Sequence, residues 1–369
     1  MDLTLENCLK YVEDGKLSMH ESADGKLVGF KYSLGTVYGH YWDEITMQCR
    51  GIVFEKSTGK IVAHPFDKFF NWQEIYAEDG TYAEIGKILC NIKNFEPAVT
   101  KQFIALDKLD GSLAIVFCYE NDWWVKTAGA FDSEQAIWAK KWLDANIDTS
   151  YMIEGYTYCF EIISNQDPHV CKYDYNGLVL LGFYNQNHRP AEFMDIVELA
   201  YKLECRYATQ VKFNSIEEAL AYTKGLDVNH EGFVLTFKSG FKVKIKGLEY
   251  LEKFHMISGI TKKDIRLHYD ETRGCIDPEY FASIPEELTD MKLYAKKIDD
   301  LSRYIYDTCL PKVPLIEHLE GREKYETAKT LVKSDYLCIL MDMANGKTNI
   351  WPKIWTIVRR EIKEPDDED

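Results

Sequence analysis

The chain has 369 residues, of which 46% are hydrophobic and 14% aromatic, so it can form a sizeable core and general disorder is excluded. Asp and Glu number 60 against 44 Lys and Arg, and the formal net charge of −16 argues against a protein that coats nucleic acid along its length. At about 150 residues per domain, this length indicates two domains, or three.

Several other classes are also excluded by simple patterns. No run of about 18 apolar residues predicts a membrane span, and the acidic, amphipathic N-terminus is unlike a signal peptide, so we expect a cytoplasmic protein, in the host cytoplasm if it is viral. The 10 cysteines contain no C-x-x-C pair, which predicts reduced thiols and no zinc ribbon. The 9 histidines show no H-x-x-x-H spacing and give a histidine-based metal site little support.

Short apolar runs rich in β-branched and aromatic residues predict strands through roughly the first 250 residues. The predicted strands are Leu27–Tyr32, Gly51–Phe54, Phe103–Leu106, Leu113–Tyr119, Trp123–Lys126, Thr157–Ile163, Leu178–Tyr184, Gly232–Phe237 and Phe241–Ile245. Helical periodicity predicts helices over Ser133–Leu143, Ala191–Leu203 and Ser215–Lys224. Lys238–Gly240 predicts a tight hairpin turn between the last two strands.

After about Lys246 the strand signals end and longer helical patterns follow. The predicted helices are Leu248–Ile257, Pro285–Cys309, Tyr325–Ala344 and Trp351–Ile362. We therefore place a domain boundary after residue 247, between a mixed α and β domain (1–247) and a helical domain (248–369).

The segment Phe103–Leu113 contains the sharpest local signal. An apolar strand leads Lys108 into a short turn made by Asp110, Gly111 and Ser112, where glycine tolerates a positive φ. A lysine held at a strand end beside other cations can act as a nucleophile toward phosphorus. The alternative is a plain hairpin whose Lys108 is merely exposed, since K-x-D-G is short enough to occur by chance.

Charged residues also interrupt the later strands. Glu161 lies within an apolar strand, where a buried carboxylate needs a partner unless alternation places it on a solvent face. Glu231 precedes another apolar strand. Lys242, Lys244 and Lys246 alternate and so share one face, where like charges repel unless an anion lies against them. A bound polyphosphate is the functional interpretation, and a solvated edge strand is the alternative.

Three further cations stand near strand ends. Arg50 begins a strand and offers a planar fork for phosphate, whereas Lys68, within the aromatic stretch Pro65–Asn71, offers a point charge. Lys126 ends the strand Trp123–Lys126 and adds a third cation. The Phe69–Phe70 pair is more typical of a core than of a ligand-binding surface.

Taken in order, these motifs resemble those of the covalent nucleotidyltransferase superfamily of ATP-dependent ligases and capping guanylyltransferases. Lys108-Leu109-Asp110-Gly111-Ser112 is similar to motif I with its adenylated lysine, Phe160-Glu161 to motif III, Glu231-Gly232-Phe233 to motif IV, and Lys244-Ile245-Lys246 to motif V. Within the superfamily, residues 28–250 most resemble the type-1 RNA ligases, the family of the bacteriophage tRNA-repair ligase. Three more stretches support this likeness: Cys49–Glu55, Asp67–Asn71 and Ser133–Ala136.

The resemblance implies a fold and a set of site residues. The fold would be an α+β, ATP-grasp-like nucleotidyltransferase domain built on antiparallel sheets, followed by an all-helical C-terminal domain. That second domain either contributes RNA specificity or only supports the fold. Lys108 would attack the α-phosphate of ATP and hold AMP, Glu161 would contact the ribose, and Glu231 would place Mg²⁺ (or Mn²⁺) through water. Lys244 and Lys246 would hold the phosphates as catalytic residues. Further nucleotide contacts would come from Tyr32, Arg50, Lys68, Phe70, Gly111 and Lys126.

One position departs from the family pattern. Some members have a second essential lysine where this chain has Ala128. Either Lys126 covers that role, or one phosphate contact is missing.

The implied function is ATP-dependent RNA ligation in RNA or tRNA repair. The enzyme would join an RNA 5′-phosphate to a 3′-hydroxyl through lysyl-AMP and RNA-adenylate intermediates. It would act as a monomer without a membrane partner. A tRNA broken in its anticodon loop is one candidate substrate. A DNA ligase or capping guanylyltransferase is an alternative, but these usually carry an OB-fold after motif V, where this chain is predicted helical. A catalytically inactive module that binds RNA ends is another, against which the intact motif residues argue.

Overall fold

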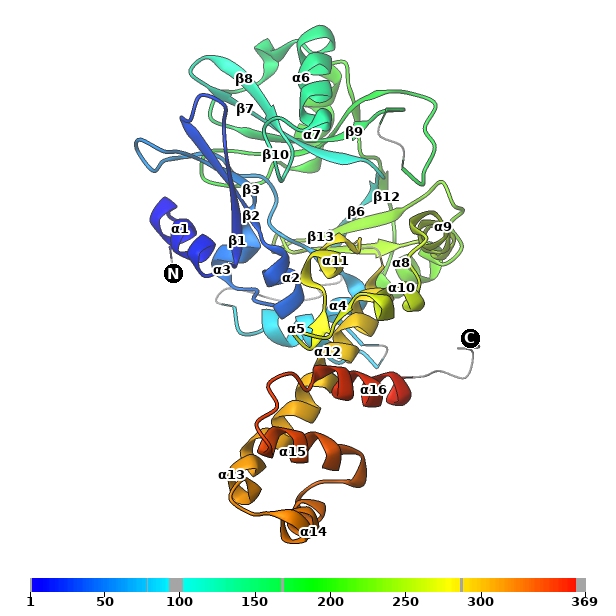
Figure 1. The fold of residues 1–369 in the computed structure, drawn as a ribbon. Coiled ribbons are helices and arrows are strands. Elements are labelled where there is room, and N and C mark those ends of the chain that lie inside the picture. The colour runs from blue at the N-terminus through cyan, green and yellow to red at the C-terminus, as the bar shows by residue number, and fades with distance from the viewer. Residues whose placement is uncertain (1, 78, 93–101, 167–168, 286–287, 363–369) are drawn as a thin grey trace. The chain divides into compact units, whose positions relative to one another are not determined.

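The computed structural model describes residues 2–77, 79–92, 102–166, 169–285 and 288–362. The chain divides into two compact units, Met1–Lys253 and Phe254–Asp369 (Figure 1). The division falls within helix α9 (Leu248–Ser258), a few residues after the boundary expected at residue 247. Within these described ranges the first unit contains three β-sheets, and the second unit is mainly helical.

The first sheet is an antiparallel meander of four strands. Its strands, in order, are β1 (Leu17–Glu21), β2 (Leu27–Tyr32), β3 (Arg50–Glu55) and β4 (Ile61–Ala63). Alternation along β2 and β3 divides their apolar side chains between two cores, so that Phe30 and Phe54 enter the largest core while Leu27 and Val53 pack toward the second sheet. This sheet is accompanied by α1 (Leu5–Glu13), α2 (Leu34–Gly39) and α3 (Glu44–Gln48).

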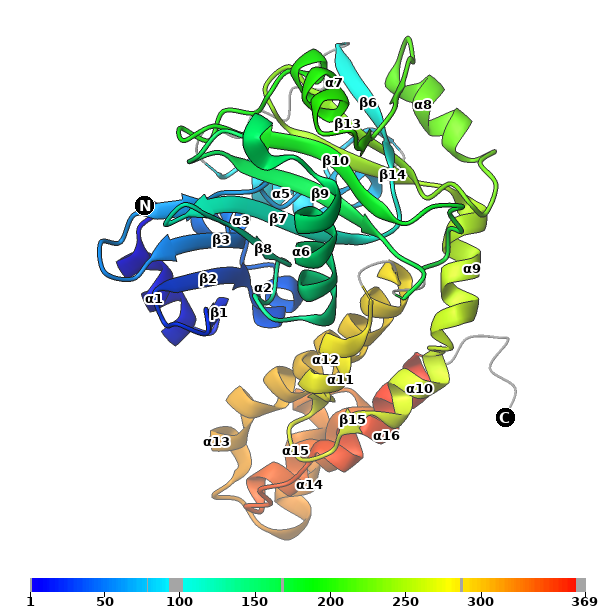
Figure 2. The same ribbon diagram turned by 90° about the horizontal axis from the view of Figure 1, so that it is seen from above.

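The second sheet has five strands in the order β11-β10-β9-β7-β8. Their bounds are Arg206–Tyr207, Gly177–Tyr184, Thr157–Ile163, Ser112–Tyr119 and Asp122–Lys126. Helices α6 (Glu134–Asn146) and α7 (Phe193–Lys202) cover one face (Figure 2). Tyr158, Phe160 and Ile162 of β9 belong to the core on that face, so alternation places Glu161 on the other.

The third sheet also has five strands, in the order β12-β6-β13-β14-β5. Their bounds are Gln210–Val211, Phe103–Lys108, Gly232–Phe237, Lys242–Lys246 and Phe70–Asn71. One face contributes Ala105, Leu235 and Val243 to the largest core, together with apolar residues of α5 (Glu84–Leu89) and α8 (Ile216–Thr223). The short helix α4 (Trp72–Ile75) follows β5.

Two alternatives raised by the sequence are wrong. Strand β14 has β13 on one side and β5 on the other, so its lysines do not lie on a solvated edge strand. The segment Leu109–Gly111 is not a hairpin turn either, because β6 and β7 belong to different sheets. This segment crosses from the third sheet to the second, and Lys108 is the last residue before the crossing.

Among its described residues, the second unit is helical apart from one small hairpin, which the sequence patterns did not predict. The hairpin pairs β15 (Tyr269–Asp270) with β16 (Cys275–Ile276). The helices are α10 (Lys262–Leu267), α11 (Pro278–Ser283), α12 (Thr289–Cys309), α13 (Val313–Ile316), α14 (Gly321–Leu331), α15 (Leu337–Ala344) and α16 (Trp351–Glu361). An α+β region with largely antiparallel sheets followed by a helical region confirms the expected fold class.

Two predicted helices differ from those found. The single helix predicted over Tyr325–Ala344 is wrong, because Val332 and Lys333 are extended and separate α14 from α15. This break lets Ala328 of α14 and Ile339 and Leu340 of α15 all be buried. The helix predicted over 285–309 begins at Thr289, and residues 286–287 lie outside the described residues. Among the described helices, none combines the length and apolar character needed to cross a bilayer.

Candidate active site

A buried carboxylate joins two amines at the centre of the site. Glu231 Oε2 accepts from Lys108 Nζ at 2.7 Å, and Glu231 Oε1 lies 2.7 Å from Lys246 Nζ. The Glu231 side chain is 2% exposed, against 21% for Lys108. Burial raises the pKa of Glu231, but the attraction of Lys108 and Lys246 outweighs burial and leaves the pKa below its usual value. Glu231 is therefore an anion held between two cations.

Strand register brings these three residues together. Gly232 of β13 lies opposite Lys108 of β6 on one side and Lys246 of β14 on the other. Gly232 has φ +143°, and a Cβ there would come within 2.0 Å of the Ile245 carbonyl oxygen. Only glycine allows the three strands to approach this closely beside Glu231.

The face of the third sheet opposite its core carries more positive charge. In β14, Val243 and Ile245 point into the core, so Lys242, Lys244 and Lys246 point to the other face, as the sequence pattern predicts. Lys244 and Lys246 are buried, and Lys242 donates to Thr236 Oγ1 at 2.8 Å. Burial lowers the pKa of Lys242 to about 8. This arrangement is one that an anion would stabilise.

Glu161 faces the same region from the second sheet. It is 9% exposed, so the solvent-face alternative is wrong. Burial raises the pKa of Glu161 to about 7, opposed by the positive charges of Lys108 and Arg50 and reinforced by Glu231. A Cβ at Gly111 would lie 2.3 Å from the Ile162 carbonyl oxygen and 2.9 Å from Glu161 Cγ, so glycine is what lets the Lys108 turn pack against β9.

Asp110 anchors that turn, a role that the sequence patterns did not single out. Its carboxylate accepts from the Cys171 amide at 2.9 Å and from the Tyr250 hydroxyl at 3.0 Å, and the Asp110 amide donates to the Tyr173 hydroxyl at 2.8 Å. Lys246 Nζ lies 5.3 Å from the Tyr250 ring centroid. In the sequence, only the position of Asp110 two residues after Lys108 in K-x-D-G could have indicated this role. The residues that bond to Asp110 are distant from it in the sequence.

Arg50 lies over aromatic rings at the start of β3. Its guanidinium carbon is 4.8 Å from the centroid of Phe69. Its Nη1 is buried and has no hydrogen-bond partner within the described parts of the chain. A buried guanidinium nitrogen without an acceptor is costly, and a phosphate oxygen would satisfy it.

Lys68 is surrounded by aromatic rings. Its Nζ lies 5.1 Å from the centroids of Tyr32 and Phe70 and 5.5 Å from that of Trp42. Phe70 is 1% exposed and belongs to the core, so it supports Lys68 from the core side. These rings stabilise the Lys68 ammonium group through cation–π contacts and hold it in one place.

Lys126 has a different environment. It is fully buried, and its Nζ donates to the Thr127 carbonyl at 2.6 Å and to the carbonyls of Gly51 and Ala128 at 3.4 Å. Burial, with a smaller contribution from Lys31, lowers the pKa of Lys126 to about 7. Its amine thus ties the 127–128 turn to the start of β3.

A cavity of about 650 Å³ opens beside the central ion pair. Its lining includes Lys108, Glu231, Lys172, Tyr173, Tyr175 and Arg206. The Arg206 guanidinium lies 4.1 Å from the Tyr175 ring centroid. A volume of this size, with aromatic walls and an amine at one end, suits a nucleotide-sized ligand.

The structure thus brings Lys108, Glu231 and Lys246 into direct contact and places the charges of Glu161 and Arg50 close enough to act on one another. Lys68, Tyr32 and Phe70 form a second group, and Lys126 a third. An amine beside several cations, two carboxylates and a cavity is an arrangement suited to attack on a polyanion.

Comparisons with known proteins agree with these motifs. Residues 48–250, more than half of the chain, match the family model described as RNA ligase. The chain is 25% identical over 224 residues to a "Putative bifunctional polynucleotide kinase/RNA ligase" of Autographa californica nuclear polyhedrosis virus, covering 56% of this chain and 30% of the relative. It is 24% identical over 183 residues to an "RNA ligase" of Rhodothermus phage RM378, covering 43% and 41%.

A solved structure is also similar. The "Naegleria gruberi RNA ligase with PPi" aligns with a TM-score of 0.35 at 20% identity, covering 41% of this chain and 51% of that one. The chain thus spans well under two thirds of the length of these relatives.

Proposed function

The chain belongs to the RNA ligase family, and from this premise we propose that it is an ATP-dependent RNA ligase that adenylates itself on Lys108. The observation that carries the proposal is the contact of Lys108 with Glu231 and, through it, with Lys246. A nucleophilic lysine needs a fixed direction, which this contact supplies. It also needs a site that favours a polyanion, which the lysines of β14 support.

In the proposed first step, Lys108 Nζ forms a bond to the α-phosphorus of ATP. The bond from that phosphorus to the β-phosphate oxygen breaks, and pyrophosphate leaves with the electron pair while the amine loses a proton. The AMP group then passes to the 5′-phosphate of an RNA end. Attack by a 3′-hydroxyl on that activated end forms the phosphodiester bond and releases AMP.

The residues present fit ATP. Arg50 has a buried Nη1 that lacks an acceptor in the described residues. Lys108 also borders a cavity large enough for a nucleoside, whose lining does not include Glu161 or Arg50. We assign Glu161 to the ribose, and Lys244, Lys246, Arg50 and Lys68 to the phosphates. Tyr32, Phe70, Gly111 and Lys126 would position these contacts, since each touches or supports one of them or its strand.

Glu231 is the residue we assign to the metal. Both of its oxygens already contact amines, so it would hold Mg²⁺ (or Mn²⁺) through water rather than directly. A divalent ion there would neutralise charge on the phosphates as pyrophosphate leaves.

Covalent labelling tests the proposal. Wild-type protein incubated with ATP labelled at the α-phosphate and Mg²⁺ should form a protein-AMP adduct that acid releases, as expected for a phosphoramidate. Lys108→Ala should form none. Lys141→Ala is the matched control, because Lys141 is an exposed lysine on α6 outside the lining of that cavity, and it should label normally. Absence of labelling in wild type with any nucleotide would overturn the proposal.

We further propose that the helical residues 248–369 contribute to RNA choice, with broken tRNA as the substrate. A tRNA cut in its anticodon loop, with 5′-phosphate and 3′-hydroxyl ends, should then be sealed faster than a linear oligoribonucleotide with the same ends. Equal rates would limit the function to general RNA repair. Sealing of nicked DNA would favour the DNA ligase alternative, and labelling by GTP in place of ATP would favour the guanylyltransferase alternative. RNA binding without labelling by any nucleotide would favour an inactive module that binds RNA ends.

A further inference from the structure

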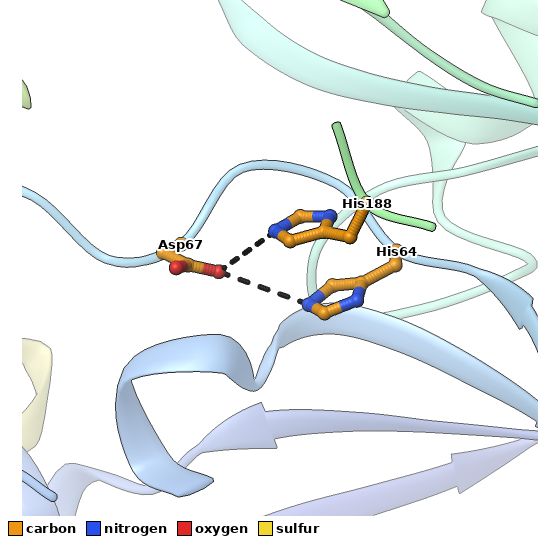
Figure 3. A group of neighbouring side chains, drawn as sticks. All are labelled: His64, Asp67 and His188. Atoms are coloured by element: carbon orange, nitrogen blue, oxygen red, sulfur yellow. Dashed lines mark hydrogen bonds and ion pairs between the residues drawn. The ribbon is translucent and has the colours of Figure 1, made fainter. Parts of the chain in front are cut away.

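Two histidines and an aspartate meet beside Lys68, although the sequence separates them widely. His64 follows β4, Asp67 lies three residues later, and His188 stands in the turn after β10. Asp67 Oδ1 is 3.2 Å from His188 Nε2 and 3.7 Å from His64 Nε2. Figure 3 shows both imidazoles directing a nitrogen toward the same carboxylate oxygen.

The spacing of these donor atoms suits a small divalent ion. The three donors lie within 4.8 Å of one another. Around a tetrahedral zinc ion with Zn–N bonds of about 2.0–2.1 Å, neighbouring donor atoms are about 3.3 Å apart. Two of the three donor separations, 3.2 and 3.7 Å, bracket that value. The imidazole ring centroids are 3.4 Å apart with an interplanar angle of 7°, and both rings direct Nε2 toward Asp67.

The surrounding residues hold the two rings in place and leave ring nitrogens unsatisfied. His188 is packed between the rings of His64 and Tyr184, the latter at 4.7 Å. Its backbone is in the left-handed region at φ 54°, a conformation that is uncommon outside glycine and is often kept for a local purpose. His64 Nε2 and His188 Nδ1 are buried and have no hydrogen-bond partner in the described residues. A buried ring nitrogen without a partner is costly, and a metal would satisfy that of His64.

We propose that His64, Asp67 and His188 form a zinc-binding site. Two imidazole nitrogens and one carboxylate suit Zn²⁺, and they disfavour Mg²⁺, which prefers oxygen donors. Three protein ligands leave a fourth position open, and a cavity of about 310 Å³ lined by Asp67 and His188 reaches it. The Asp67 side chain is 48% exposed, so an ion has a path to enter.

A zinc ion at this site would link two segments of the fold. It would tie the segment that carries Lys68 to the turn after β10, which belongs to a different part of the fold. None of the three residues has a part in the adenylation step proposed above, so metal binding and ligation are measured separately.

Metal content of the full chain tests the proposal. Wild type is stripped with a chelator, dialysed against Zn²⁺ or Mg²⁺ without nucleotide, and assayed by mass spectrometry for bound metal. We expect wild type to retain one more equivalent of Zn²⁺ than the double variant His64→Gln/His188→Gln, and no matching equivalent of Mg²⁺. His230→Gln is the control, because His230 is exposed and pairs only with Asp227 among its described contacts, and it should bind like wild type.

Cysteines are the competing zinc ligands, and Co²⁺ separates them from this site. A Co²⁺ ion on two imidazoles and a carboxylate gives weak visible bands without the strong near-ultraviolet charge-transfer band of cobalt–thiolate bonds. That thiolate-free spectrum is expected in wild type and should disappear in the double variant. No zinc in dialysed wild type, or equal zinc in wild type and the double variant, would overturn the proposal.

A milder substitution covers the case in which the double variant does not fold. Asp67→Asn keeps both imidazoles and the size of the side chain but removes the anionic ligand. We expect its Zn²⁺ affinity to fall at least tenfold while its far-ultraviolet circular dichroism stays like that of wild type. Unchanged affinity in this variant would also contradict the assignment.

Discussion

Lys108 Nζ lies 2.7 Å from Glu231 Oε2, although 123 residues separate the two along the chain. Because Glu231 also contacts Lys246, Glu231→Gln should remove the negative charge that both amines share. Removing one member of a buried ion pair costs about 3–5 kcal/mol, and the partial exposure of Lys108 places the expected loss near the lower value. Urea denaturation measures this loss, and labelling by ATP should fall at least tenfold.

Glu249→Gln is the control for that substitution. Glu249 is an exposed residue in the first turn of α9, so its loss should change the free energy of unfolding by under about 0.5 kcal/mol. A Glu231→Gln protein as stable and as active as this control would show that the ion pair is unimportant.

Gly232→Ala should disrupt the same centre through the backbone. A methyl group at Gly232 would lie 2.0 Å from the Ile245 carbonyl oxygen, and φ +143° is itself unfavourable for alanine. We expect a loss of stability of about 3 kcal/mol or more, because β13 must move away from β14. Thermal unfolding measures it. Gly129→Ala is the control, since nothing lies within 4 Å of its added Cβ and its φ is not positive, and its Tm should be nearly unchanged.

Glu161 should make stability depend on pH. Burial raises its pKa from 4.5 to about 7, so the folded chain binds this proton more tightly than the unfolded chain. The contribution of Glu161 to the free energy of unfolding therefore falls as pH rises from about 4.5 to about 7, and it stays low above that. Glu161→Gln lacks this titration. Relative to wild type, the variant should gain up to about 3 kcal/mol between pH 4.5 and pH 8.

Urea denaturation of both proteins at these two pH values tests this expectation. Glu154→Gln, at an exposed glutamate, should show the same difference from wild type at both values. A Glu161→Gln difference that is also constant with pH would contradict a raised pKa for Glu161.

Arg50 should be sensitive to replacement by lysine. Its buried Nη1 has no acceptor in the described residues, and lysine cannot reproduce the planar fork that would meet a phosphate. We expect Arg50→Lys to raise the KM for ATP in self-adenylation about tenfold, as loss of one charge-assisted hydrogen bond of about 1.4 kcal/mol implies. Arg189→Lys, at an exposed arginine, should leave KM unchanged. An unaltered KM in Arg50→Lys would remove Arg50 from the nucleotide site.

Much of the first unit follows from local patterns. β2, β9 and β13 have the bounds that the sequence predicts, because alternating and apolar runs end at turn residues. Helix α6 begins at Glu134, one residue after the predicted start, and the Ser133 side chain caps it by accepting from the Ala136 amide. By contrast, the two-residue strands β15 and β16 are too short to show a period.

The break between α14 and α15 was not predictable for a related reason. Both segments are helical in pattern, and only the packing of Ile339 and Leu340 into the second unit requires the turn at Val332. Local periodicity records which residues are apolar, whereas the direction in which a helix continues depends on contacts with distant segments.

The amino-acid sequence by itself determined which chemical groups were available and in which order: Lys108 in its glycine turn, the carboxylates at 161 and 231, and the alternating lysines of β14. Only the tertiary structure decided their states. Strand register placed Glu231 between two amines, the crossing from one sheet to another placed Glu161 in a buried position, and distant turns brought His188 onto His64. The physical reason is that alternation acts within a few residues, whereas burial and charge pairing depend on distant neighbours, such as Glu231, which is 123 residues from Lys108.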